Sequence, residues 1–207
     1  MQRNLFDILT VILLFHLKKR LHCAILIIIN EKTSERTTVM KKLAIVINGK
    51  GGVGKDTLCD FAASRYKTLN VSTITPIKEL AAAHGWNGEK TPKARKFLAD
   101  LKQVFTEWND LPNSYALGKY EEFLGGDYDL FFVHIREGSE IQKFVDGAKK
   151  LGGSPITLLI RSKRCERKYG NASDDDVESF DYDYTYQNDL PLEKAESDFV
   201  RFLEGIM

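Results

Sequence analysis

The chain has 207 residues, which is enough to form one domain with a sizeable buried core. Hydrophobic residues make up 43% of it and charged residues 29%, as in an ordinary soluble globular protein, which excludes a fibrous, wholly disordered or disulfide-framework chain. The net charge of +1 creates no global field toward nucleic acid or membranes, so we expect no nucleic-acid partner.

Residues 1–39 differ in composition from the rest of the chain. Two apolar runs, Ile8–Phe15 and Cys23–Ile29, are separated by the basic break His16–His22. Each run is far shorter than the ~20 residues that span a membrane, and the order of charged and small residues does not fit a signal peptide. We interpret residues 1–39 as an extension outside the fold, with Met40 as the working start and no stable membrane span. A membrane hairpin or a membrane-surface anchor is the alternative.

The rest of the chain, residues 40–207, alternates between short apolar runs and amphipathic segments. The runs that predict strands are Leu43–Ile47, Val71–Ile74, Asp129–Ile135, Ile156–Arg161 and Tyr182–Tyr186. The segments that predict helices are Lys55–Lys67, Pro76–Ala83, Pro92–Trp108, Tyr115–Leu124, Glu140–Leu151 and Leu192–Ile206. Strands separated by helices form a parallel sheet covered on both faces, so we predict a three-layer α/β domain with a five-stranded parallel sheet.

The cysteines give no sign of a disulfide framework or of a metal site. Cys23, Cys59 and Cys165 are odd in number and share no metal-ligand spacing. Reduced thiols in a cytoplasmic protein are therefore expected.

The strongest chemical signal is a glycine-rich segment between the first strand and the first helix. It reads Gly49-Lys50-Gly51-Gly52-Val53-Gly54-Lys55-Asp56-Thr57. Glycines let successive backbone N–H groups converge on an anion, the helix dipole adds attraction, and Lys55 reaches the outer phosphates. The spacing matches the phosphate-binding motif G-x-x-x-x-G-K, with Asp56 where the motif has Ser or Thr. We predict that the segment binds ATP, with Thr57 offering its hydroxyl to Mg²⁺.

Two families share features of this loop. Lys50–Lys55 resembles the deviant loop of partitioning and septum-site ATPases, whose extra lysine acts across a dimer. Gly54–Thr57 resembles instead the loop of nucleoside monophosphate kinases, among which the deoxynucleoside monophosphate kinases of phages and bacteria often place Asp before Thr. Phe132–Arg161 and the ending after Tyr182 are also similar to those kinases. The resemblance, from about Lys42 to Leu203, implies a P-loop kinase of the adenylate kinase-like superfamily.

The chain departs from this kinase pattern at one position. The family usually has an aspartate at the end of the third strand, where this chain has His134. The carboxylate that handles magnesium and activates the acceptor is therefore left open between Glu137 and Asp56.

Cationic side chains near the loop are the next candidates for catalytic residues, because phosphoryl transfer between two polyanions depends on positive charge around the transferring group. Arg136 follows the third strand, at the edge of the sheet where α/β proteins bind ligands. Arg161 and Arg164 open a polar segment over residues 162–180 that we predict to be a lid. Together with Lys55 they are the expected catalytic cations, because arginine meets phosphate oxygens in a bidentate manner.

The acceptor is expected to bind over residues 76–124, the region where such kinases hold it. Lys93, Arg95 and Lys96 lie near the start of the helix that begins at Pro92 and could bind the acceptor's phosphate. Arg95 is the leading candidate, together with Arg136. Trp86 would stack on its base.

We therefore expect ATP-dependent phosphorylation of a small phosphorylated acceptor, with a (deoxy)nucleoside monophosphate as the leading class. One alternative is a switch ATPase that dimerises through Lys50, and another is a nucleotide-binding module without turnover. The residues leave the identity of the acceptor and the oligomeric state open.

Overall fold

The computed structural model describes residues 42–165 and 177–207. The predicted extension 1–39 and the middle of the predicted lid lie outside these residues. In the described part of the chain, no helix is long and apolar enough to cross a membrane.

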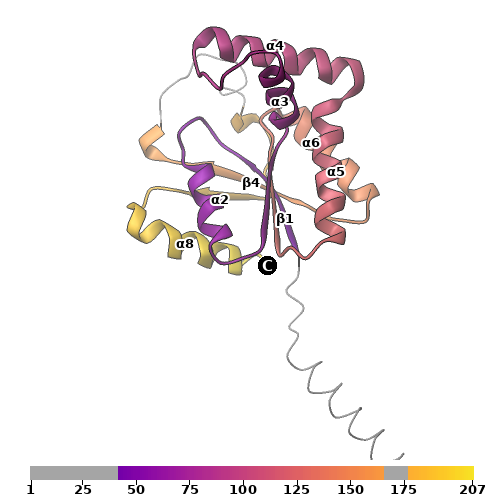
Figure 1. The fold of residues 1–207 in the computed structure, drawn as a ribbon. Coiled ribbons are helices and arrows are strands. Elements are labelled where there is room, and N and C mark those ends of the chain that lie inside the picture. Colours follow the sequence, from indigo (N-terminus) through magenta and orange to yellow (C-terminus); the bar gives the residue numbers. More distant parts are fainter. Residues whose placement is uncertain (1–41, 166–176) are drawn as a thin grey trace, which may run out of the picture. The chain divides into compact units, whose positions relative to one another are not determined.

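A five-stranded parallel sheet forms the middle layer of the fold, as the sequence predicts (Figure 1). The strands are β1 (Leu43–Asn48), β2 (Thr68–Ser72), β3 (Leu130–His134), β4 (Ile156–Arg161) and β5 (Tyr184–Gln187), in the order β2-β3-β1-β4-β5. The central strand β1 is buried along its whole length. It pairs with β3 on one side and β4 on the other, so its carboxyl end lies between two neighbouring strand ends.

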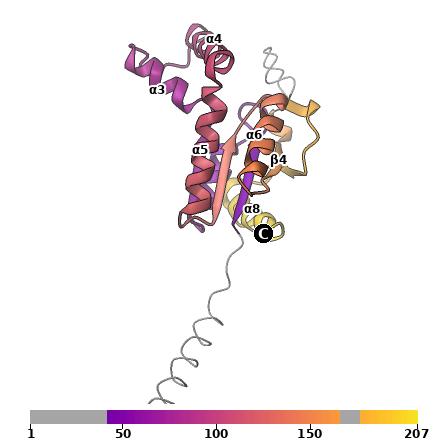
Figure 2. The same cartoon turned by 90° about the vertical axis from the view of Figure 1, so that its right-hand side faces the viewer.

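Helices cover both faces of the sheet, which completes the predicted three layers (Figures 1 and 2). The covering helices are α2 (Lys55–Ala63), α5 (Leu111–Gly125), α6 (Gly138–Lys150) and α8 (Leu192–Glu204), and two further helices are α3 (Thr75–Ala83) and α4 (Pro92–Asn109). Successive residues of a strand point to opposite faces. Ile45 and Ile47 accordingly pack in one buried cluster with residues of α2 and α8, while Val46 packs in a second cluster with residues of α5 and α6.

Three predicted boundaries are wrong by three residues or more. The second strand starts at Thr68 instead of Val71, because this edge strand includes half-exposed polar residues that hide it from a search for apolar runs. The first helix ends at Ala63 instead of Lys67. Helix α5 begins four residues earlier than predicted, at Leu111, because Asp110 takes a left-handed conformation (φ 54°) that separates α4 from α5.

Helices α3 and α4 lie at one end of the sheet, outside the three layers (Figures 1 and 2). Helix α3 follows directly on the carboxyl end of β2, so this is the end where the first strand delivers the glycine-rich loop. Helix α4 starts as its sequence predicts, with Thr91 accepting a hydrogen bond from the Ala94 amide (3.2 Å) and Pro92 in the first turn.

Candidate phosphate-binding site

Three glycines of the loop between β1 and α2 have positive φ, and two of them, Gly49 and Gly54, are also closely packed. Gly49 has φ 148° and Gly54 has φ 89°. A Cβ atom on Gly49 would lie 2.5 Å from the Ile160 carbonyl oxygen, and one on Gly54 would lie 2.6 Å from Nδ2 of Asn188. Both positions therefore need glycine for their conformation and for their space.

Lys55 begins α2 and turns back over the loop. Its Nζ donates hydrogen bonds to the carbonyl oxygens of Gly49 (2.5 Å) and Lys50 (3.0 Å). No side chain caps the amino end of α2, and Asp56 and Thr57 are exposed in its first turn. An uncapped helix end beside an ammonium group and a hydroxyl is a site that fits a polyphosphate with a hard cation.

Two buried asparagines, which the sequence analysis does not single out, hold the loop in place. Oδ1 of Asn48 accepts the Gly49 amide (2.8 Å), and its Nδ2 donates to the Arg136 carbonyl (2.9 Å) and to the Tyr182 hydroxyl (2.7 Å). Nδ2 of Asn188 donates to the Val53 carbonyl (2.8 Å). The signal for Asn48 is local, because it is an amide at the end of a run that is otherwise apolar.

Glu178, at the start of the second described stretch, lies between two of the predicted cations. Its carboxylate is 3.2 Å from Nζ of Lys50 and 3.4 Å from the Arg161 guanidinium. Arg164 lies elsewhere, because its guanidinium donates to the carbonyl oxygens of Asn188 (3.1 Å) and Leu190 (3.4 Å). The structure thus brings Lys50 and Arg161 together and places Arg164 against the turn that precedes α8.

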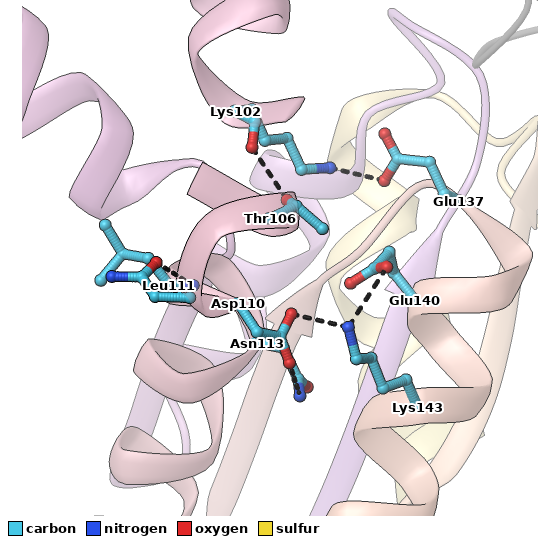
Figure 3. A network of polar contacts seen from close by, with 9 residues as sticks. Lys102, Thr106, Asp110, Leu111, Asn113, Glu137, Glu140 and Lys143 are labelled. Atoms are coloured by element: carbon cyan, nitrogen blue, oxygen red, sulfur yellow. Dashed lines mark hydrogen bonds and ion pairs between the residues drawn. The ribbon is translucent and has the colours of Figure 1, made fainter. Parts of the chain in front are cut away.

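Arg136 is exposed and follows β3 by two residues. Its neighbour Glu137 accepts a hydrogen bond of 2.6 Å from Nζ of Lys102 on α4 (Figure 3). Burial alone would raise the pKa of the Glu137 carboxyl, but the charge and hydrogen bond of Lys102 outweigh it and the net pKa is lowered. This ion pair attaches α4 to the turn that carries Arg136.

His134 ends β3, beside the first turn of α2. Its Nε2 lies 2.9 Å from Oδ1 of Asn70, and its Nδ1 lies 4.0 Å from the Asp56 carboxylate. Burial lowers the pKa of His134 to about 4, more than the charge of Asp56 raises it, so the imidazole is neutral at pH 7. His134 therefore supplies neither the negative charge of an aspartate nor a positive charge.

The two predicted acceptor residues lie on the α3–α4 side of the loop. Trp86, half-buried just after α3, donates its indole N–H to the Glu89 carbonyl (3.2 Å). Arg95 is exposed in the first turn of α4. It precedes Lys102 by seven residues, which puts both on one face of the helix, and Lys102 reaches the turn of Arg136.

A groove lies apart from these residues, between α5 and α6. It is lined by residues such as Leu117, Lys143 and Lys150, and none of the predicted site residues borders it. Figure 3 labels two of its lining residues, Asn113 and Lys143, and shows the contact of Lys143 with Asp110 (2.7 Å).

Comparison with known proteins supports the fold and goes no further. No family model and no curated protein matches the chain. The tunicamycin resistance protein of Deinococcus radiodurans matches with a TM-score of 0.50 and 13% identity, over 79% of this chain and 96% of that one. A putative kinase from Chloroflexus aurantiacus matches with a TM-score of 0.47 and 13% identity, over 81% and 99% of the two chains. Shikimate kinase from Aquifex aeolicus has a TM-score of 0.45 and 13% identity, over 79% and 97%.

The chain thus has a three-layer α/β fold like that of the Deinococcus radiodurans protein, with five parallel strands flanked by helices and a glycine-rich loop after the first strand.

Proposed function

We propose that the protein transfers a phosphoryl group from ATP to a small phosphorylated acceptor, with (deoxy)nucleoside monophosphates as the acceptor class. The observation that carries the proposal is the loop Gly49–Thr57 at the uncapped amino end of α2, with Lys55 held across it. Fold likeness alone does not assign an activity, so the argument rests on this site.

On the donor side, the ATP phosphates would lie on the loop and Lys55 would contact the group in transfer. Bound Mg²⁺ would neutralise charge between the phosphates, and the Thr57 hydroxyl is a suitable ligand. Of the two carboxylates that the sequence leaves open, the contacts favour Asp56. Its side chain is 95% exposed in the first turn of α2, whereas Glu137 is already paired with Lys102.

On the acceptor side, Arg136 and Arg95 would bind the phosphate of the acceptor, and Trp86 would contact its base. Arg136 stands on the turn whose carbonyl accepts a hydrogen bond from Asn48, so a rigid buried amide joins it to the loop. Arg161 would become available to the transferring group once phosphates compete for the contact that it makes with Glu178. Arg164 would act as a fourth cation only after leaving the carbonyls that it now contacts.

The deciding experiment is a screen of ribo- and deoxynucleoside monophosphates with ATP and Mg²⁺, followed by coupled detection of ADP. Release of ADP that depends on the acceptor, and that is lost in Lys55→Met, would support the proposal. Hydrolysis of ATP without any acceptor would favour the switch ATPase. Binding of ATP without turnover would favour a nucleotide-binding module, and either result would overturn the proposed activity.

The switch ATPase alternative also predicts a role for Lys50, because in that class this lysine acts across a dimer. In this chain Lys50 is engaged by Glu178 of the same chain at 3.2 Å. Substituting Lys50 by Ala should therefore leave acceptor-dependent turnover within a few-fold of the wild type, whereas loss of all ATP-dependent activity would favour the switch ATPase.

A further inference from the structure

Helix α4 exposes a row of large apolar side chains. Phe97 is 46% exposed, Val104 is 58% exposed and Trp108 is 82% exposed. Their spacing of seven and four residues places them on one face of the helix, which we call the outer face of α4. Half-buried Leu101 borders the same face. A continuous apolar row of this kind on a long helix marks an interaction surface.

The outer face points away from the phosphate-binding site. At 3.6 residues per turn, Phe97, Val104 and Trp108 lie roughly 120–160° around the helix from Lys102. Lys102 points to Glu137 and the turn of Arg136 (Figure 3). The acceptor would lie on the Lys102 side, so it cannot cover the apolar row. A macromolecular partner is required instead.

Charges along the edge of the outer face indicate which partner fits. The first half of α4 carries Lys93 and Lys96 on this edge, and the second half carries Glu107. Asp100 stands between them and contacts Lys96 at 2.7 Å. A mixed edge, basic at one end and acidic at the other, suits neither a lipid surface nor nucleic acid. It complements itself when two such helices run antiparallel.

We propose that the outer face of α4 binds the outer face of α4 in a second copy of this chain, around a two-fold axis. In the antiparallel pair Phe97 meets Trp108 of the other copy, and Leu101 meets Val104. Lys96 lies within reach of Glu107 across the interface, and this contact occurs twice by symmetry. Apolar and aromatic side chains inside the contact and charged side chains at its rim are the usual composition of a protein interface. The exclusion of the acceptor from this face rests on the proposed function, whereas the dimer itself is tested below without any measurement of activity.

The first test is the mass of the full chain in solution, measured by sedimentation velocity over a range of concentrations. We expect a monomer–dimer equilibrium, and Trp108→Ser should raise the dimer Kd at least about 100-fold. Leu192→Ser is the matched control, because Leu192 is also exposed (64%) but lies on α8. A monomer at every concentration, or a dimer that Trp108→Ser leaves intact while Leu192→Ser disrupts it, would overturn the proposal.

A charge exchange tests the antiparallel arrangement. Lys96→Glu and Glu107→Lys should each raise the dimer Kd about three- to tenfold, because each places like charges in both symmetric contacts. The double variant should recover the wild-type value, since the opposite charges face one another again. Additive weakening in the double variant, with the melting temperature unchanged, would exclude this pairing.

Fluorescence gives a readout at the surface itself. The chain has two tryptophans, so Trp86→Phe leaves Trp108 as the sole tryptophan emitter. Its emission should shift to shorter wavelength as the concentration passes the Kd from sedimentation, because the indole leaves water. Emission that stays constant while the dimer forms would place the interface elsewhere and overturn the proposal.

Discussion

The ammonium of Lys50 lies 3.2 Å from the carboxylate of Glu178, so an ion pair joins the glycine-rich loop to the chain that follows residue 176. The same carboxylate contacts Arg161 at 3.4 Å. One anion thus stands between two cations at the mouth of the loop, where the phosphates of a nucleotide would also be attracted.

Replacing Glu178 by Gln should strengthen ATP binding. The substitution keeps the side chain's size and removes the charge that competes with the phosphates for Lys50 and Arg161. Exposed ion pairs are worth roughly 0.2–1 kcal/mol, so the Kd for ATP should fall about two- to fivefold, and the gain should shrink in high salt. Calorimetric titration with ATP measures it. Glu193→Gln, an exposed position on α8, is the control, and weaker binding in Glu178→Gln would contradict the competition.

Lys55→Met should lower turnover at least a hundredfold. Loss of one charge-stabilising contact to the transferring group typically costs about 3–4 kcal/mol of transition-state stabilisation. The variant should fold, but its melting temperature should fall by about 2–4 °C, because the Gly49 and Lys50 carbonyls lose their donor. Wild-type rates in the folded variant would refute the role of Lys55.

Arg95→Ala and Arg136→Ala should each weaken binding of the acceptor and leave the affinity for ATP unchanged. A charge-assisted bond to a phosphate contributes roughly 1.5–3 kcal/mol, so kcat/KM for the acceptor should fall about ten- to hundredfold. Arg136→Lys should recover only part of the loss, because an ammonium cannot make the bidentate contact.

The controls for these two variants separate binding from folding. Lys93→Ala removes a charge from the same first turns of α4 and should leave the acceptor KM unchanged. Asn48 contacts the Arg136 carbonyl, which alanine retains, and the melting temperature of Arg136→Ala, measured beside its kinetics, separates a loss of binding from a loss of folded protein. A normal acceptor KM and kcat in a stable Arg136→Ala protein would show that Arg136 does not bind the acceptor's phosphate.

Asp56→Asn should reduce kcat and raise the Mg²⁺ concentration needed for half-maximal rate, whereas Glu137→Gln should leave the Mg²⁺ requirement unchanged. The reason is that Asp56 is exposed beside Thr57 while Glu137 is held by Lys102 at 2.6 Å. Titrating the initial rate with Mg²⁺ in both variants decides between the two carboxylates. A change confined to Glu137→Gln would reverse the assignment.

The ion pair of Lys102 and Glu137 should make stability depend on pH. The folded-state pKa of Glu137 is lowered, so its ionised form stabilises the fold above the unfolded-state pKa of about 4.3. That contribution is lost as the pH falls through the lower folded-state value. Urea unfolding should therefore show Glu137→Gln less stable than the wild type at pH 7, and the difference should shrink as the pH falls below the unfolded-state pKa and through the lower folded-state pKa. A difference that persists in acid would assign the effect to packing.

Local patterns in the sequence determined the class of fold and the phosphate-binding loop. The alternation of apolar runs with helical periods predicts a parallel sheet between two layers of helices, because each element must bury its apolar side. The spacing of Gly49, Gly54 and Lys55 predicts the loop, because these residues are close neighbours in the sequence. The edge strand Thr68–Ser72 starts three residues before the run that predicts it, because an edge strand does not need an unbroken apolar run.

Only the tertiary structure decided which distant residues meet. Asn48 and Tyr182 are 134 positions apart, and Val53 and Asn188 are 135 apart, yet each pair shares a hydrogen bond at the loop. The competition at Glu178 is likewise invisible until both cations that it contacts are placed. Hydrophobic period and glycine spacing are properties of neighbouring residues. Polar contacts are set by the order in which the sheet brings strand ends together, which no local pattern records.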